Sequence, residues 1–444
     1  MADAGGGREA VLDVAIDAGH VTPGLSGGLA HVLVGLITAL GRLSDGPERY
    51  VIVVRSAQQS EWLSDFVGPN QRVVLKLPLR RHADQIHRAV GHAARSILRR
   101  VHRASPESAH IPRSDGFYES LGCAVVHFPH QDFVASRLPA VYNPHDLQHR
   151  HYPEFFAPGE VARRDAVYRS GARLARVVVV ASQWVKDDVV QQYQVDTDKV
   201  QVIPWGAPTM AYPPASPADL ARVAGAYGLK PPFVLYPART WPHKNHLRLL
   251  DALARLRDVR GVTVNAVFTG TIYEPFWPRI ERRLEELRLD RQVKRLGFVP
   301  ARDMRSIYRL ADFLVMPTLF ESDSFPIYEA WLDGLPVACS SATALPDQVA
   351  DAALVFDPDD VESIAAAIHR LTLDGGLRED LRRRGYRRLA DFDWALTAKA
   401  YRAVYRRAGG LSLAEEDRRL LSWDWMRQPR RDPTSSSESG SYTV

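Results

Sequence analysis

Short apolar runs rich in β-branched residues alternate with helical patterns along most of the chain, and this alternation constrains the fold more than any other feature. Several runs are apolar throughout, which is typical of strands covered on both faces. Strands joined by helical crossovers form parallel sheets. The predicted strands are 11–16, 50–54, 73–77, 123–128, 176–181, 200–204, 233–237, 262–270, 293–297, 312–317 and 336–340.

A proline-rich stretch at 206–217 interrupts this pattern and leaves two similar halves. The 444 residues also exceed one ordinary core, so two domains are expected. The prediction is an α/β protein with two doubly wound parallel-sheet (Rossmann-like) domains facing a cleft, over 1–205 and 218–392. A helix at 393–410 is expected to pack back on the N-terminal domain. The extension over 411–444 ends in a serine-rich tail that is expected to be disordered.

Composition excludes few classes of protein. The net charge is +5 and the pI is near 9.1, a modest basic excess that does not choose among anionic partners. Cys123 and Cys339 lie far apart in apolar runs and are expected to be buried thiols. The most apolar window, 29–40, contains His31 and is too short to span a bilayer. With no recognisable secretory signal, a cytoplasmic protein is expected.

Two basic residues follow the first predicted strand of the second half. Arg239 comes directly after the strand at 233–237, and Lys244 lies five residues later, before a helical pattern. Ligands of open α/β sheets bind at the carboxyl ends of strands. These two cations therefore suit a diphosphate, although a solvated turn with two unrelated bases is the alternative.

Two glutamates eight residues apart follow a later strand. Glu321 comes after the strand at 312–317 and Glu329 lies on the second turn of the next predicted helix. Ser324 is expected to cap that helix, and its exposed amides form an anion site. Glu329 can accept hydrogen bonds from a vicinal diol. Together with Arg239 and Lys244, this pattern predicts a pocket for a nucleotide diphosphate and a polyhydroxylated group, as in a sugar transferase.

The order R-x4-K, E-x7-E and DGLPVACSSATALPDQVADAALVFDP closely resembles the retaining family-4 glycosyltransferases of GT-B fold, from about residue 200 to 400. The resemblance implies a nucleotide-sugar donor and no metal or other cofactor. It also implies that Arg239 and Lys244 bind the donor diphosphate, that Glu321 faces the donor sugar and that Glu329 holds the ribose. This chain departs from the family's common Gly-Phe-Gly after the first glutamate, because Asp323 lies there between two serines.

Further donor contacts follow from the same resemblance. The stretch 297–312 resembles the family's nucleobase loop, which implies roles for Phe298 and Val299. At the helix start, the amides near Ser324 and Phe325 are expected to stabilise the leaving diphosphate. Contacts of this kind are largely backbone, so UDP, GDP, ADP and TDP donors stay equally open.

The N-terminal half resembles the family more loosely. Gly24, Gly27 and Gly28 precede a helix and resemble the family's glycine loop, although a plain helix-entry turn is the alternative. Within NPHDLQHRHYPEFF, His145 is expected to line the donor sugar and Asp146 to support it.

Three other features carry weaker expectations. His127 and His130 can reach the cleft, but structural roles are the alternative. The D-x-D spacing of Asp196 and Asp198 is attributed to a polar turn, not to a metal site. The arginine-rich stretch 80–103 is either a solvated surface helix or an amphipathic helix that lies on anionic membrane or guides an anionic acceptor.

Competing functions remain open. A glycoside hydrolase would use Glu321 and Glu329 as its acid and nucleophile, but the neighbouring cations argue for a phosphate. An NDP-sugar epimerase or a catalytically silent binding subunit would use the same fold. For a transferase, the acceptor is a glycan, a lipid-linked glycan or a small metabolite, and no nucleic-acid partner is expected. Peripheral contact with the inner membrane surface would run through 80–103.

Overall fold

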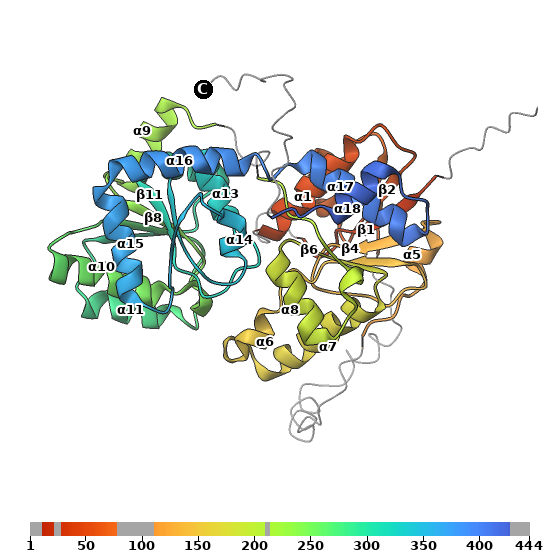
Figure 1. Ribbon diagram of the computed structural model, residues 1–444, viewed down its shortest axis with the longest axis horizontal. Coiled ribbons are helices and arrows are strands. Elements are labelled where there is room, and N and C mark those ends of the chain that lie inside the picture. Colours follow the sequence, from red (N-terminus) through yellow and green to blue (C-terminus); the bar gives the residue numbers. More distant parts are fainter. Residues whose placement is uncertain (1–10, 22–27, 78–110, 209–213, 427–444) are drawn as a thin grey trace, which may run out of the picture. The chain divides into compact units, whose positions relative to one another are not determined.

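The computed structural model describes residues 11–21, 28–77, 111–208 and 214–426 (Figure 1). The chain divides into two compact units. The first unit contains residues 1–180, 186–201 and 398–418, and the second contains 181–185, 202–397 and 419–444.

The first unit is built on a seven-stranded sheet in the order β3-β2-β1-β4-β5-β6-β7. Its strands are β1 (Asp13–Asp17), β2 (Arg49–Val54), β3 (Gln71–Leu75), β4 (Val125–Phe128), β5 (Ala140–Tyr142), β6 (Val177–Val180) and β7 (Val200–Val202). The pairs from β3 through to β6 are parallel. All four valines of β6 are buried, as expected for a strand covered on both faces.

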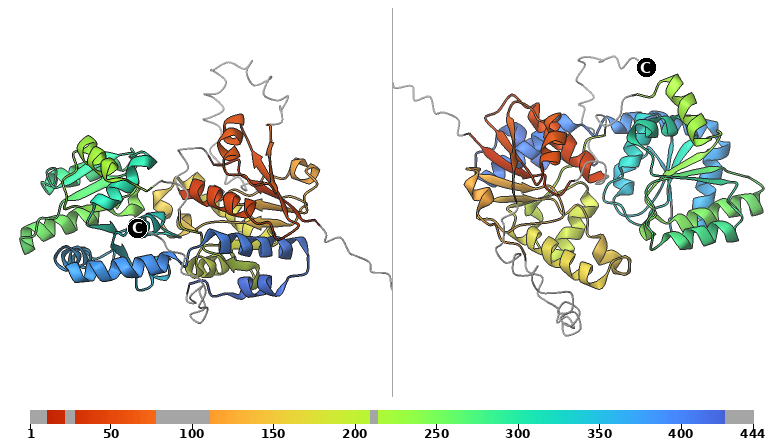
Figure 2. Two further views of the ribbon diagram at one scale, coloured as in Figure 1. Left: turned by 90° about the horizontal axis from the view of Figure 1, so that it is seen from above. Right: turned by 180° about the vertical axis from the view of Figure 1, so that it is seen from behind.

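Helices lie on both sides of this sheet (Figure 2). They are α1 (Gly28–Gly41), α2 (Ala57–Ser64), α5 (Phe117–Ser120), α6 (Gln148–His151), α7 (Pro158–Leu174), most of α8 (Gln183–Tyr193), most of α17 (Trp394–Gly409) and much of α18 (Glu415–Ser422). A buried polar network ties α17 to the sheet. The Asn143 side chain donates to the Val179 carbonyl and to the Tyr401 hydroxyl, both at 2.9 Å.

The second unit contains a six-stranded parallel sheet in the order β10-β9-β8-β11-β12-β13. Its strands are β8 (Val234–Pro237), β9 (Ala266–Thr269), β10 (Val293–Gly297), β11 (Phe313–Met316), β12 (Val337–Ser340) and β13 (Leu354–Phe356). In Figure 1, β8 and β11 run through the middle of this unit.

The helices of the second unit are α9 (Pro217–Tyr227), α10 (His246–Arg260), α11 (Trp277–Glu286), α12 (Ala301–Leu310), α13 (Phe325–Leu332), α14 (Leu345–Val349), α15 (Val361–Leu373) and α16 (Gly375–Leu389). Local sequence fixes their ends. Ser216 and Asp219 form a capping box at the start of α9, and Gly228 ends that helix with a φ of 57°, where glycine avoids a side-chain clash.

The predicted α/β class with two parallel sheets is confirmed, and every predicted strand has a counterpart. Two strands were missed, β5 and β13, each of three residues. β5 lies between Pro139 and Pro144, so its apolar run is too short to stand out from a loop. Cys123 and Cys339 are buried free thiols, as predicted.

Several sequence predictions fall outside the described residues. These are the glycines at 24 and 27, the arginine-rich stretch 80–103 and the serine-rich tail. Within the described ranges, no helix combines the length and the apolar character that crossing a bilayer requires.

Candidate active site

The predicted phosphate-binding residues lie at the point where the strand order of the second sheet reverses. β8 and β11 are neighbours, yet the chain passes through β9 and β10 on one side before it enters β11 on the other. Arg239 follows β8 and Glu321 follows β11, both beyond the carboxyl ends of these strands. Such a topological switch point is where open α/β sheets bind ligands.

Hydrogen bonds tie together the two loops that carry these residues. The His243 carbonyl accepts the Leu319 backbone N–H at 2.7 Å. The buried Asn245 side chain donates to the Pro317 carbonyl at 2.9 Å. Lys244 lies between these two anchors, so its backbone is fixed against the β11 loop. Asn245 was not singled out from the sequence, although it directly follows the lysine.

Lys244 and Glu321 form an ion pair across the two loops. Their side chains are 20% and 12% exposed, so the pair is shielded from bulk water but still reachable. An ammonium group has three N–H donors, so Lys244 can keep Glu321 and still contact a phosphate oxygen. The structure therefore brings together two residues that lie 77 positions apart in the sequence.

Arg239 lies at the same edge of the sheet and is exposed. Its guanidinium is 5.7 Å from the ring centroid of Trp241, within the range of a cation–π contact. The Trp241 ring in turn stacks on Tyr273, with centroids 5.1 Å apart and planes at 19°. This aromatic pair supports the arginine and was not found from the sequence.

The turn before α13 differs from the prediction at Ser324. The helix does begin at Phe325, with Pro326 in its first turn, but the Ser324 side chain makes no capping hydrogen bond. Instead, its backbone N–H donates to Gln348 Oε1 and its carbonyl accepts from Gln348 Nε2, both at 2.9 Å. The predicted side-chain cap is therefore wrong. The Gln348 side chain holds this turn through the backbone of Ser324.

Glu329 lies on the second turn of α13, as predicted. One carboxylate oxygen accepts the Tyr308 hydroxyl at 2.6 Å. Tyr308 is buried on α12, and a buried tyrosine hydroxyl needs a polar partner; this contact fixes the orientation of Glu329. In the predicted nucleobase loop, Phe298 is 63% exposed and Val299 is buried.

Asp323, the departure from the family pattern, lies in a poorly solvated position beside Glu321. It accepts the Tyr328 hydroxyl at 2.8 Å through Oδ1, while its Oδ2 is buried without a partner among the described atoms. Burial raises the pKa of Asp323 to about 7; the Tyr328 hydrogen bond opposes that rise, and the negative charge of Glu321 adds to it. Asp323 Oδ2 therefore does not face solvent.

Replacing Asp323 with asparagine should remove a pH dependence of stability. The folded state keeps the Asp323 proton up to about pH 7, whereas the unfolded chain releases it near its ordinary pKa of 3.8. The wild type should therefore lose stability as the pH rises between these values. Urea unfolding at pH 5 and pH 8 measures this loss, and the variant should gain on the wild type at pH 8. If the wild type and the variant differ in free energy of unfolding by the same amount at both pH values, Asp323 does not keep its proton in the folded state.

The histidine segment of the first unit has an unusual backbone. His145 has a φ of 65°, which is rare for a residue with a side chain and concentrates at functional sites. Its Nε2 contacts the Pro129 carbonyl at 3.0 Å, and burial lowers the pKa of His145 to about 4. The Asp146 carboxylate accepts the Gln148 backbone N–H at 3.0 Å, just as α6 begins.

His127 and His130, which were also predicted to reach the cleft, have different surroundings. His127 is fully buried, with Nε2 2.5 Å from Asn143 Oδ1 and Nδ1 2.9 Å from the Tyr405 hydroxyl. It is therefore part of the packing between the sheet and α17, which fits its structural alternative. His130 instead lies 3.9 Å from Asp17. Gly28 is the first residue of α1, and its predicted partner Gly27 lies outside the described residues.

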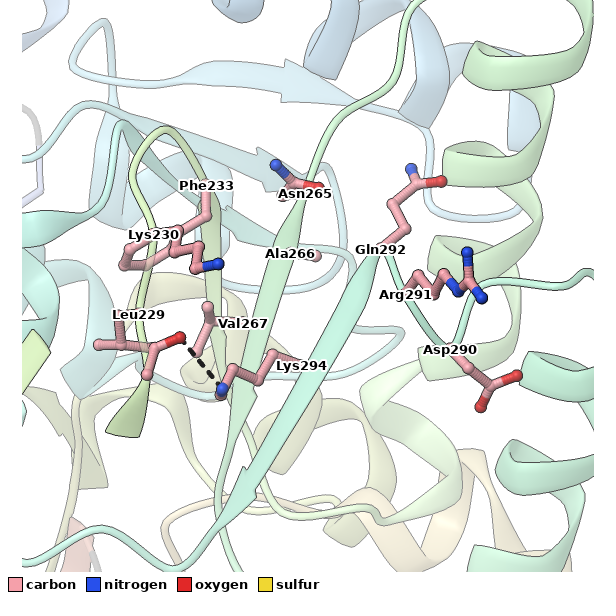
Figure 3. Close-up of a pocket in the computed structure, with 11 residues that line it drawn as sticks. Leu229, Lys230, Phe233, Asn265, Ala266, Val267, Asp290, Arg291, Gln292 and Lys294 are labelled. Carbon is pink, nitrogen blue, oxygen red and sulfur yellow. Dashed lines mark hydrogen bonds between the residues drawn. The ribbon is translucent and has the colours of Figure 1, made fainter. Parts of the chain in front are cut away.

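A hollow of about 340 Å³ lies at the opposite edge of the second sheet (Figure 3). Phe233, Asn265 and Gln292 line it, and they directly precede β8, β9 and β10. Lys294 donates to the Gly228 carbonyl at 3.1 Å there. Because this hollow is at the amino ends of the strands, it is separate from the switch-point residues, which lie at the carboxyl ends.

Comparison with known proteins agrees with this architecture. Residues 221–388 match the family model described as glycosyl transferases group 1, and residues 26–210 match that of glycosyltransferase family 4. The O-antigen chain mannosyltransferase B of Escherichia coli is 29% identical over 57% of this chain and 67% of its own length. A D-inositol 3-phosphate glycosyltransferase of Corynebacterium efficiens is 27% identical over 61% of this chain and 66% of its own length.

Among solved structures, the Anabaena protein HepE, crystallised with UDP and glucose, superposes with a TM-score of 0.65 at 17% identity. The superposition covers 89% of this chain and 100% of HepE, which establishes the shared two-domain fold. The two family models together match most of the chain, one in each half. The chain therefore belongs to the family-4 glycosyltransferases of GT-B fold.

Proposed function

We propose that the protein transfers a sugar from a nucleotide-diphosphate donor to a polyhydroxylated acceptor, with retention of configuration at the anomeric carbon and without a metal ion. The observation that carries this proposal is the Lys244–Glu321 pair at the switch point of the second sheet. It combines a fixed cation for a phosphate with a carboxylate for a sugar.

The leaving diphosphate gains negative charge in the transition state, so cations fixed before the reaction stabilise the transition state most. In this proposal Lys244 and Arg239 supply that charge, and the N-terminus of α13 adds the positive end of its dipole. These groups would do the work that a divalent metal does in other transferases. The acceptor proton would leave to the departing phosphate on the same face.

Glu321 and Glu329 would recognise the two hydroxylated parts of the donor. Lys244 holds Glu321 beside the phosphate position, which suits contact with the donor sugar. Tyr308 orients Glu329, whose carboxylate would accept hydrogen bonds from the ribose diol. The UDP and glucose bound to HepE and the mannosyl transfer in the name of the Escherichia coli relative support a nucleotide-sugar donor and a glycan acceptor.

The stereochemical course gives the direct test. The protein is incubated with GDP-mannose or UDP-glucose and a panel of sugar acceptors, with EDTA present, and the product is examined by proton NMR. Retention predicts an α-linked product from either α-linked donor, formed at the same rate with and without EDTA. A β-linked product would contradict retention, and loss of the reaction in EDTA would contradict metal independence.

A further inference from the structure

The segment that follows β12 holds the loop that carries Glu321. The strands β11 and β12 are neighbours in the second sheet, so the loops at their carboxyl ends lie side by side. The Ser340 hydroxyl, at the end of β12, donates to the Thr318 carbonyl at 2.7 Å. Three residues farther along the chain, Thr343 contacts Glu321 itself. The segment after β12 is therefore part of the scaffold of the proposed donor site.

The Thr343 hydroxyl makes two hydrogen bonds to the backbone of one residue. Its Oγ1 accepts the Glu321 N–H at 2.9 Å and donates its own proton to the Glu321 carbonyl. The Ala344 N–H adds a third contact, to the same carbonyl, at 3.3 Å. A hydroxyl can donate and accept at the same time, so this one side chain fixes both polar backbone groups of Glu321.

Thr343 has a backbone conformation that is unfavourable for its residue type. Its φ is 50°, in the left-handed region where a β-branched residue is an outlier and where glycine lies at little cost. Such residues persist where the surrounding structure holds them, and they concentrate at functional sites. The contacts of the Thr343 hydroxyl with Glu321 help to hold this unfavourable conformation.

The same segment also holds the other end of the Glu321 loop. Gln348, in α14, bonds to the N–H and the carbonyl of Ser324, both at 2.9 Å. Thr343 and Gln348 therefore act in the same way, each through two hydrogen bonds to the backbone of one residue. Between them they fix the stretch from Glu321 to the start of α13, and with it the distance from the Glu321 backbone to the helix N-terminus.

The direction of the Glu321 carboxylate depends on this backbone. The carboxylate pairs with Lys244, and Lys244 is held separately, because the Asn245 side chain donates to the Pro317 carbonyl at 2.9 Å. A change in the Glu321 backbone would therefore move the carboxylate and leave the lysine in place. A misplacement of about 1 Å in a group that acts on a substrate can lower a rate about a hundredfold.

We propose that Thr343 is a positioning residue, whose hydroxyl fixes the direction of the Glu321 carboxylate, so that recognition of the donor sugar depends on it and binding of the nucleotide does not. This inference rests on the proposed function, in which Glu321 contacts the sugar while Lys244 and Glu329 bind the nucleotide diphosphate. Thr343 itself acts only through Glu321. Removing its hydroxyl should therefore change the affinity for a nucleotide sugar without changing the affinity for the free nucleotide.

The test uses the full chain and four ligand pairs, which are GDP-mannose with GDP and the glucose conjugates of UDP, ADP and TDP with their free nucleotides. Isothermal titration calorimetry gives the dissociation constants. Thr343→Val keeps the shape of the side chain without its hydroxyl and should raise the dissociation constant of the nucleotide sugar about tenfold, with that of the free nucleotide unchanged. Thr343→Gly, which relieves the backbone, should weaken sugar binding equally, whereas Thr343→Ser should restore it.

Hydrogen exchange followed by mass spectrometry, over peptides that contain Glu321, measures the contact without any ligand. The Glu321 amide should exchange roughly three- to tenfold faster in Thr343→Val than in the wild type, because it loses its acceptor. The matched control is Thr372→Val, which removes a hydroxyl that donates to the Ile368 carbonyl at 2.8 Å in α15. This control should change neither the exchange at Glu321 nor any dissociation constant, and circular dichroism shows that each variant is folded.

Unchanged exchange at Glu321 in Thr343→Val would overturn the inference. So would full affinity for the nucleotide sugar in Thr343→Gly, an equal loss of affinity for the sugar and the free nucleotide, or a wild type that binds a free nucleotide but none of the four nucleotide sugars. These results leave the nucleotide site in place. If no free nucleotide binds to the wild type, the proposed function fails, and the exchange rates alone then decide whether Thr343 holds Glu321.

Discussion

Replacing Lys244 with alanine should lower turnover at least about a hundredfold while the protein stays folded. The loss of one fixed donor to a developing anion typically raises the barrier by about 3 kcal/mol. Lys244 supplies such a donor in the proposed mechanism, and its partner Glu321 would also lose its counter-ion. The rate is measured as nucleotide release with saturating donor, and circular dichroism reports the fold.

The matched control for this variant is Lys230→Ala. Lys230 is an exposed lysine of the same unit that lines the hollow at the amino ends of the strands (Figure 3). Its removal should leave turnover unchanged, because that edge of the sheet takes no part in the proposed reaction. Full activity in Lys244→Ala would remove the assignment of the diphosphate site.

Replacing Glu329 with alanine should weaken binding of the nucleotide diphosphate roughly ten- to a hundredfold. In the proposed site its carboxylate accepts hydrogen bonds from the ribose diol, and such charge-assisted bonds contribute about 1.5–3 kcal/mol. Isothermal titration calorimetry with the free nucleotide measures the change without any sugar or acceptor.

A second variant distinguishes the effect of the Glu329 carboxylate on nucleotide affinity from the effect of its orientation. Tyr308→Phe keeps Glu329 but removes the hydroxyl that holds it at 2.6 Å, so its nucleotide affinity should lie between that of the wild type and that of Glu329→Ala. Equal affinity in all three proteins would exclude Glu329 as the ribose-binding residue.

The fold was largely predictable because buried parallel strands leave a strong local pattern. The four consecutive valines of β6 are β-branched residues, which favour a strand. β5 was missed because three residues between two prolines do not form a pattern. Its neighbours in the sheet, not its own sequence, make it a strand.

The proximity of Lys244 and Glu321 could be predicted because chemistry and position coincide in the sequence. Lys244 and Glu321 each follow a strand, so a parallel sheet places both at one edge. The residues that fix the loops and side chains of this site were not predicted. Asn245, Gln348 and Tyr308 act through contacts between loops and helices far apart in the chain. No local pattern encodes such contacts.

The error at Ser324 has the same origin. Its residue type and its place before Pro326 predicted a side-chain cap, and the helix does begin there. Gln348, 24 residues later, binds the Ser324 backbone on both sides and supplies the turn instead. A tertiary contact therefore replaced the expected local one.

Thermal unfolding of the full chain with UDP, GDP, ADP and TDP tests the central claim most directly. Each nucleotide is supplied at roughly a hundred times a plausible dissociation constant, where binding adds about 2.7 kcal/mol of stability. The account predicts that at least one of them raises the unfolding temperature clearly, and that Glu329→Ala reduces the shift. No shift with any of the four would contradict a nucleotide-diphosphate site at the switch point of the second sheet.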